Sequence, residues 1–206
     1  MQRFHPFHSQ LSVGKGRALY CGPLQHLEAH GYGAPVLHVG IYGPFKMKLG
    51  DGPWRPYRIA LVPPGVRHAL DLAGGVHGKL FVEIDSPSAG AFCRRFPYRK
   101  GAVGAFHDPE ILAEFQWVFE ENPRQPEVER RLDRLLPARQ DESLIDPRIQ
   151  KIVALIRDEP DRNHTQAELG AALGLSPSRV LHLFSEQIGV PYRRYRMWKR
   201  LWLSAE

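Results

Sequence analysis

Five cationic and four aromatic side chains lie within eleven residues near the C-terminal end of the sequence. The segment reads Tyr192-Arg193-Arg194-Tyr195-Arg196-Met197-Trp198-Lys199-Arg200-Leu201-Trp202. Guanidinium and ammonium groups bind phosphate oxygens, while Trp and Leu side chains on the same helix can pack inward. The segment therefore predicts a helix that lies near a polyanion.

Histidines are the second group that could do chemistry. His26, His30, His38, His68 and His77 fall within the first half of the chain. Imidazole is a common ligand for transition metals, so the group raises the question of a metal site. No glycine-rich phosphate loop, serine-centred elbow or paired carboxylate cluster stands out beside it, and we expect no cofactor.

The elements that would position the cationic segment form an interrupted helical pattern over residues 165–190. Thr165 and Glu168 have the spacing of a capping box at a helix start. Gly174 ends that helix, and Ser176 and Pro177 are an N-cap and a first-turn residue that start another. This pattern predicts a helix-turn-helix.

The second helix of this pair has one apolar face, made by Val180, Leu183, Phe184 and Ile188, which should pack against the first helix. The opposite side is where a recognition helix meets base edges, and it carries Ser178, Arg179, Leu181, His182 and Ser185. A helical hairpin used only for packing or dimerisation is the alternative interpretation.

Residues 1–106 differ from the rest in being dense in glycine and proline, with short apolar segments at 34–42, 57–62 and 79–84. Short strands separated by turns are typical of a β-sandwich or barrel. Residues 107–137 predict two helices, one starting at Asp108-Pro109 and a charged one over 126–136. We interpret 138–146 as a linker and 147–206 as an all-α subdomain, so the expected fold class is α+β.

The net charge of +6 is concentrated toward the C-terminal end. Residues 147–206 hold 10 Lys and Arg against 6 Asp and Glu, and residues 1–146 hold 18 against 16. Such an imbalance suits a nucleic-acid partner. No apolar run is long enough to cross a membrane and the start has no signal-peptide core, so we expect a cytoplasmic protein with no membrane partner. Cys21 and Cys93 are expected to be free thiols.

Residues 167–191, followed by Tyr195 and Arg200-Leu201, resemble the first helix-turn-helix and connecting helix of the AraC family of bacterial transcription regulators. The resemblance covers about 147–206 and implies double-stranded DNA as a partner. It implies base contacts from Ser178, Leu181 and His182, with Arg179 and Ser185 adding to sequence preference. It also implies phosphate contacts from Arg193, Arg194, Arg196 and Lys199.

Two departures from the family pattern affect these expectations. Leu181 is apolar where a polar residue is more usual, so it could offer only a contact to a thymine methyl group. The family normally has a second helix-turn-helix after the connecting helix, and the sequence stops at Glu206. A single reading helix should bind DNA weakly unless the protein forms a homodimer.

The segment from Ile59 to His68, with its Pro-Gly turn before the histidine, resembles part of a cupin barrel. Such a barrel often binds an effector or mediates dimerisation in AraC-type regulators. Candidates for lining an effector pocket are His38, Tyr42, Trp54, His68 and Phe81. Enzymatic cupins have a His-x-His pair, which is absent from this sequence, so we expect no metal site.

Two other interpretations stay open at this point. One is a metal-dependent cupin enzyme of the isomerase or dioxygenase type, with ligands among His26, His30, His38 and His68 and with helices that only pack or pair the barrels. The other is a dimerisation module whose DNA-reading half is incomplete.

Overall fold

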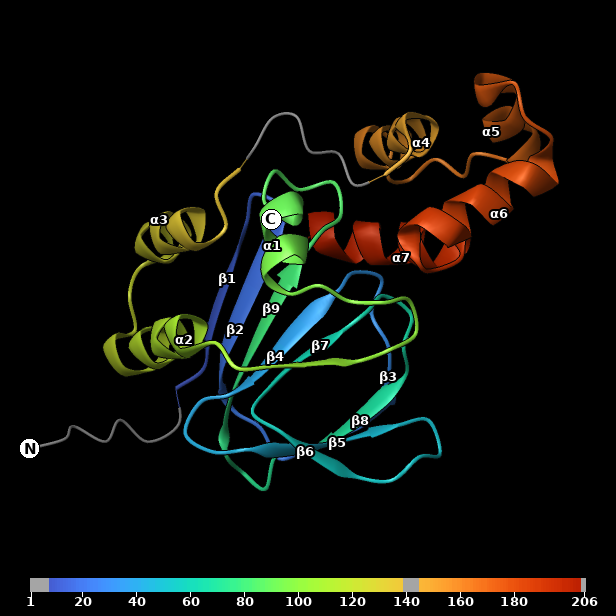
Figure 1. Cartoon of the computed structure of the whole chain (residues 1–206). Helices are drawn as coiled ribbons and strands as arrows, with labels where there is room; N and C mark the ends of the chain where they lie inside the picture. The colour runs from blue at the N-terminus through green and yellow to red at the C-terminus, as the bar shows by residue number, and fades with distance from the viewer. Residues whose placement is uncertain (1–7, 139–144, 205–206) are drawn as a thin grey trace, which may run out of the picture.

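The structure is a computed structural model that describes residues 8–138 and 145–204. The α+β class expected from the sequence is confirmed: strands fill the first half and helices the second (Figure 1). The strands in the described residues are β1 (Gln10–Gly14), β2 (Arg17–Pro23), β3 (His26–His30), β4 (Val36–Gly40), β5 (Phe45–Leu49), β6 (Arg55–Tyr57), β7 (Ile59–Val62), β8 (His68–Asp71), β9 (Val76–Val82) and β10 (Gly104–Phe106).

The helices after residue 107 begin close to the expected starting signals, whereas α1 was not expected. They are α1 (Ala89–Arg95), α2 (Pro109–Glu121), α3 (Gln125–Leu135), α4 (Pro147–Asp158), α5 (Gln166–Leu173), α6 (Pro177–Ile188) and α7 (Tyr192–Leu203). The Asp108 carboxylate caps α2, and Asp146 caps α4, as their Asp-Pro sequences predict. Most of the predicted linker, residues 139–144, lies outside the described residues.

The strands form two antiparallel sheets that face each other, and the two sheets together are called the barrel. One has the order β1-β2-β9-β4-β7-β10 and the other β3-β8-β5-β6. Successive side chains of a strand point to opposite faces, so β4 and β9 each contribute to two cores. Leu37 and Leu80 face α2 and α3, whereas Val36 and Phe81 face the space between the sheets.

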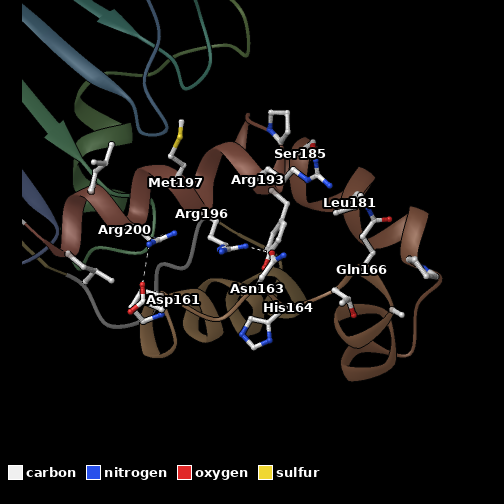
Figure 2. A pocket seen from close by; sticks show the side chains of 18 of the residues that line it. Asp161, Asn163, His164, Gln166, Leu181, Ser185, Arg193, Arg196, Met197 and Arg200 are labelled. Atoms are coloured by element: carbon white, nitrogen blue, oxygen red, sulfur yellow. Dashed lines mark hydrogen bonds and ion pairs between the residues drawn. The ribbon is translucent and has the colours of Figure 1, made fainter.

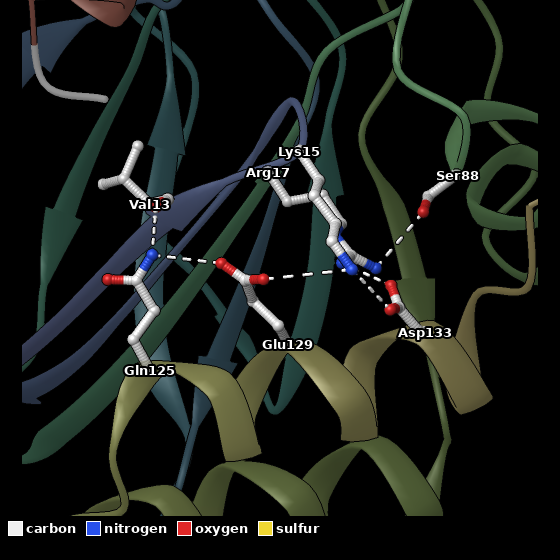
Figure 3. Close-up of polar contacts among 7 residues, drawn as sticks. All are labelled: Val13, Lys15, Arg17, Ser88, Gln125, Glu129 and Asp133. Atoms are coloured by element: carbon white, nitrogen blue, oxygen red, sulfur yellow. Dashed lines mark hydrogen bonds and ion pairs between the residues drawn. The ribbon is translucent and has the colours of Figure 1, made fainter.

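Helix α3 is fixed to the β1–β2 hairpin by a polar cluster (Figure 3). Arg17 is 2% exposed and reaches the Asp133 carboxylate at 2.6 Å and the Ser88 hydroxyl at 3.2 Å. Lys15 lies 2.8 Å from the same carboxylate, and the Gln125 side-chain amide donates to the Val13 carbonyl at 2.7 Å. The buried guanidinium needs this carboxylate because an unpaired charge is costly in a core.

The four C-terminal helices enclose a third core and meet the barrel along α7 (Figure 1). Residues of α4, α5, α6 and α7 all contribute to that core. Within the described ranges, no helix combines the length and the apolar character that crossing a membrane would require. The two cysteines are free, with Cys21 buried and Cys93 partly buried, as expected.

We expect Asp133→Ala to lower the free energy of unfolding by about 1–3 kcal/mol, because it removes a charged hydrogen-bond partner from buried Arg17. Lys15→Ala is the matched control, since Lys15 is exposed and contacts the same carboxylate, and it should cost less than about 1 kcal/mol. Urea unfolding of both variants measures the difference. Equal losses would mean that burial of Arg17 does not depend on Asp133.

Candidate nucleic-acid interface and barrel interior

The turn between α5 and α6 has the geometry that its sequence predicts. The Thr165 hydroxyl accepts from the Glu168 amide at 3.2 Å, and the Glu168 carboxylate accepts from the Thr165 amide at 2.6 Å. Gly174 has φ +64°, a left-handed conformation that favours glycine. The Ser176 hydroxyl then caps α6 by accepting from the Arg179 amide at 3.3 Å.

A second glycine, which the sequence interpretation did not single out, is equally necessary to this turn. A Cβ on Gly170 would lie 2.7 Å from the carbonyl oxygen of Leu175, closer than real Cβ contacts allow. The Leu175 amide in turn donates to the Gly170 carbonyl at 3.0 Å. The absent side chain therefore lets the turn fold back against α5 and sets the direction in which α6 leaves.

The apolar face of α6 is buried as predicted, with Val180, Leu183, Phe184 and Ile188 all in the helical core. The Phe184 ring packs edge-on against Tyr192 and Tyr195 of α7, with ring centroids 5.6 and 5.5 Å apart. These contacts fix the rotation of α6 about its own axis.

The opposite face of α6 is open at its N-terminal half. Ser178, Arg179 and His182 are exposed, whereas Leu181 and Ser185 are partly buried. The C-terminal end of α6 is held by barrel loops: Lys100 donates to the Ser185 carbonyl at 3.0 Å, and Gly65 lies against the residues that follow the helix. The exposed half therefore points away from the barrel (Figure 1).

Leu181 and Ser185 line a groove of about 1470 Å³ between the helices (Figure 2). Arg193, Arg196 and Arg200 of α7 lie along it. Arg196 donates to the Asn163 side chain, and Arg200 pairs with Asp161 at 3.3 Å. The groove is therefore cationic along α7, which matches part of the predicted phosphate-binding set.

Two further cations of α7, Lys199 and Arg194, point toward the barrel. Lys199 is 3% exposed, and its ammonium lies 2.5 Å from Glu83 and 3.2 Å from Asp85. Arg194 donates to the carbonyl of Gly31 at 3.1 Å. The prediction that Lys199 contacts phosphate is therefore wrong for this arrangement, and Arg194 is only partly accessible.

A sequence signal for the burial of Lys199 did exist. Lys199 lies four residues after Tyr195 and three before Trp202, and both of these aromatic residues are buried. Residues with that spacing share one face of a helix. Treating the cations of this segment as one polyanion-binding set overlooked that Lys199 lies on the buried side of the helix.

Three histidines form a hydrogen-bonded row between the two sheets. His38 on β4 lies 3.1 Å from His68 through their Nε2 atoms, and its Nδ1 lies 3.0 Å from the Nε2 of His77. All three are buried, and burial lowers each pKa, to about 4 for His68 and about 3 for His77. The row is therefore neutral at physiological pH.

Neutral rings in such a row can carry their protons in only one order. His68 Nδ1 lies 3.1 Å from the Val66 carbonyl, which can only accept, so this nitrogen carries the proton. The His68 Nε2 then accepts from His38, and His38 in turn accepts from His77. The remaining acceptor, His77 Nδ1, is buried and has no hydrogen-bond partner.

This arrangement does not suit the metal-enzyme interpretation. Because His38 stands between His68 and His77, the lone pairs of His38 and His68 point at neighbouring rings and not at a common centre. His26 lies outside the row, 3.3 Å from Glu28. Among the described residues, no group of three or more His, Cys, Asp or Glu could hold a metal ion.

The predicted effector-pocket residues are not all brought together. His38 and His68 are buried between the sheets, and Phe81 is partly buried on the same side. Tyr42 is 51% exposed and bonds Glu120 on α2 at 2.7 Å, and Trp54 is 41% exposed. Both lie in connections beyond strand ends, so the structure does not place them with His38 and His68, and Tyr42 instead borders a cavity of about 70 Å³ near His77.

No protein-family model matches the sequence, and no curated protein is significantly similar to it. Among solved structures, apo ToxT K231A from Vibrio cholerae strain SCE256 aligns with 94% of this chain and 83% of its own, at TM-score 0.60 and 10% identity. The two chains share one fold. The alignment extends over nearly the whole of this chain, so the likeness takes in both the strands and the helices.

Two further structures match a smaller share of the chain. One is an RmlC-like cupin family protein with a double-stranded β-helix fold from Methanocaldococcus jannaschii, which covers 39% of this chain and 85% of its own at TM-score 0.34 and 13% identity. The other is protein NMB1881 from Neisseria meningitidis, which covers 37% of this chain and 84% of its own at TM-score 0.34 and 17% identity.

We expect Lys199→Ala to lower the free energy of unfolding by about 3–5 kcal/mol, because it leaves the buried Glu83 and the partly buried Asp85 without this cation. Arg200→Ala removes an exposed pair on the same helix and should cost less than about 1 kcal/mol. Urea unfolding distinguishes the two. Similar small losses for both variants would show that the buried cluster does not hold α7 on the barrel.

The histidine row predicts a loss of stability in acid. Because the folded-state pKa values are depressed, the unfolded chain binds more protons below about pH 6.5, and the free energy of unfolding falls as the pH drops toward about 4. Each histidine contributes up to about 1.4 kcal/mol per pH unit. His77→Leu should reduce this slope, measured by urea unfolding across the pH range, and an unchanged slope would contradict this origin of the acid sensitivity.

Proposed function

We propose that the protein is a DNA-binding transcription regulator of the AraC type, in which α6 enters the major groove. The observation that carries the proposal is the division of α6 into a buried apolar face and an exposed polar face at its N-terminal half. A recognition helix needs this arrangement, because its N-terminal residues must reach base edges while the other face is held rigidly.

The position of α6 supports the same function. Helices α4, α5 and α7 hold its inner face, and barrel loops hold its C-terminal end. Ser178, Arg179 and His182 remain accessible to a large rigid partner. The likeness to ToxT shows the fold only, so this accessible surface carries the argument for DNA.

Each side chain then has a proposed role. Arg179 and His182 are the strongest candidates for hydrogen bonds to base edges, with Ser178 beside them. Leu181 and Ser185 lie at the border of the groove, where Leu181 can contact only an apolar group such as a thymine methyl. Arg193 and Arg196 contact phosphates, and Arg194 and Lys199 instead hold the barrel.

The barrel is the part that we propose responds to an effector. Helix α7 joins it to the reading helix directly, because α7 packs on α6 through Tyr195 and on the barrel through Lys199. We also propose that the protein acts as a homodimer, since one reading helix reaches one segment of the major groove and two can read a repeated site.

Selection of duplex DNA from a random pool, followed by fluorescence anisotropy on the enriched sequence, tests the function. Arg193→Ala should weaken binding to all sequences by a similar factor and reduce the slope of log affinity against log salt by about 1. His182→Ala should cost about 1–3 kcal/mol on the selected sequence and relax the preference at one position.

Arg130→Ala is the matched control, because Arg130 is an exposed arginine on α3, away from α6. Its affinity and salt slope should equal those of the unsubstituted protein. An affinity for duplex DNA that does not fall with salt, or equal losses for Arg130→Ala and Arg193→Ala, would contradict the proposed interface.

A further inference from the structure

The stretch of chain that leads through α1 to β10 carries positive charge only. Residues 86–107 hold four Lys and Arg and no Asp or Glu. Arg95 is neutralised by Asp108 at 2.7 Å and by Glu110 at 2.6 Å. Arg99 and Lys100 are exposed, and within the described residues neither forms an ion pair with a carboxylate. Their charge is therefore available to a partner.

Arg99 and Lys100 lie in a tight turn with an open tip. The Ala102 amide donates to the Arg99 carbonyl at 3.1 Å, which closes the turn. Gly101 has φ +77°, and a Cβ added there would meet no atom of the described chain within 4 Å. Gly101 and Ala102 are exposed and small. The tip of the turn can therefore approach a large, rigid surface closely.

The Lys100 side chain joins this turn to the reading helix. Its ammonium donates to the Ser185 carbonyl at 3.0 Å, where the connection approaches the junction of α6 and α7 (Figure 1). An ammonium has three N–H donors, so this contact leaves two for another acceptor. Ser185 also lines the groove along which Arg193 lies. Cations of the barrel and cations of α7 therefore meet at the C-terminal part of α6.

The position of Ser185 on α6 relates this turn to the size of a duplex. Ser185 follows Ser178 by seven residues, which places it about 10 Å further along the helix. The major groove is about 12 Å wide, and a phosphate backbone borders it on each side. A duplex whose base edges meet Ser178 and His182 therefore brings phosphates close to the level of Ser185 and Lys100.

We propose that the turn 99–102 is a second phosphate-binding element, in which Arg99 and Lys100 contact the DNA backbone beside the groove that α6 reads. The barrel then forms part of the DNA interface. Because α7 fixes the barrel against the helices through Lys199, the turn is in place before DNA binds. This inference rests on the proposed function, since it assigns a further contact to the same partner.

Fluorescence anisotropy with the selected duplex and a scrambled duplex, across a range of salt concentrations, tests the role of Arg99. Arg99→Gln should weaken binding to both duplexes by the same factor, roughly 3- to 10-fold, and reduce the slope of log affinity against log salt by about 1. Arg55→Gln is the matched control, because Arg55 is an exposed arginine on β6, at the end of the barrel opposite α7. Its affinity and slope should equal those of the unsubstituted protein.

Lys100 needs a separate test because it also holds α6. Lys100→Gln should reduce the salt slope by about 1, and Lys100→Arg, which keeps the charge, should restore it. A residue that only anchors the helix would change affinity without changing the slope. An unchanged slope in Lys100→Gln, or in Arg99→Gln, would overturn the assignment of the turn as a phosphate-binding element.

The failure of this proposal can be told apart from the failure of the proposed function. If the unsubstituted protein binds no duplex DNA, both are wrong. If His182→Ala and Arg193→Ala weaken binding as expected while Arg99→Gln behaves like Arg55→Gln, α6 remains the reading helix and the barrel turn is excluded from the interface.

Discussion

The packing of α7 against the barrel is the contact on which the arrangement of the whole chain depends. Lys199 is buried with two carboxylates that follow β9, and Trp198 beside it lies on Tyr32 and Phe81 of the barrel. The same helix sends Tyr195 into the core beneath α6. Helix α7 thus carries the ion pairs of Lys199, the contacts of Trp198 with the barrel and the contacts of Tyr195 with the helical core. For this reason α7 cannot shift on the barrel without disturbing the position of α6.

The interior of the barrel combines hydrophobic packing with an unusual set of polar groups. His38, His68 and His77 are linked to one another as neutral rings, and the Nδ1 of His77 is left buried without a hydrogen-bond partner. Lys79 lies near this row, and its ammonium donates to the Tyr32 hydroxyl. The barrel interior therefore holds polar groups that its own side chains satisfy only in part.

Local sequence patterns predicted the helices well, because caps act over three or four residues. Asp108, Asp146, Thr165 and Ser176 all cap helices as expected. The burial pattern of α6 also followed from its spacing. What the sequence could not provide was the partner of each residue across the fold: Lys199 and Arg194 belong to the barrel interface although their type and neighbourhood suggested phosphate.

The residues predicted to line an effector pocket show the same limit of sequence analysis. His38 and His68 lie between the sheets, whereas Tyr42 and Trp54 are exposed, because strand ends and turns could not be located to the residue from the sequence. Their role in an effector pocket stays a prediction. The importance of Gly170 was missed as well, since a close approach to Leu175 appears only in three dimensions. The contact of Lys79 with Tyr32 likewise forms only when β9 and the segment after β3 are brought together.

The anchoring of α6 at one end has a mechanical consequence. Its C-terminal residues are tied to the loops near Gly65 and Lys100, whereas Ser178 and Arg179 sit at the far end of a helix about 18 Å long. A tilt of about 10° at the tied end displaces the exposed N-terminal turn by roughly 3 Å, about the spacing of one base pair. Because the inner face of α6 is packed in the helical core, such a tilt has to move that core as well, so a change at the barrel loops reaches the reading face only through this packing.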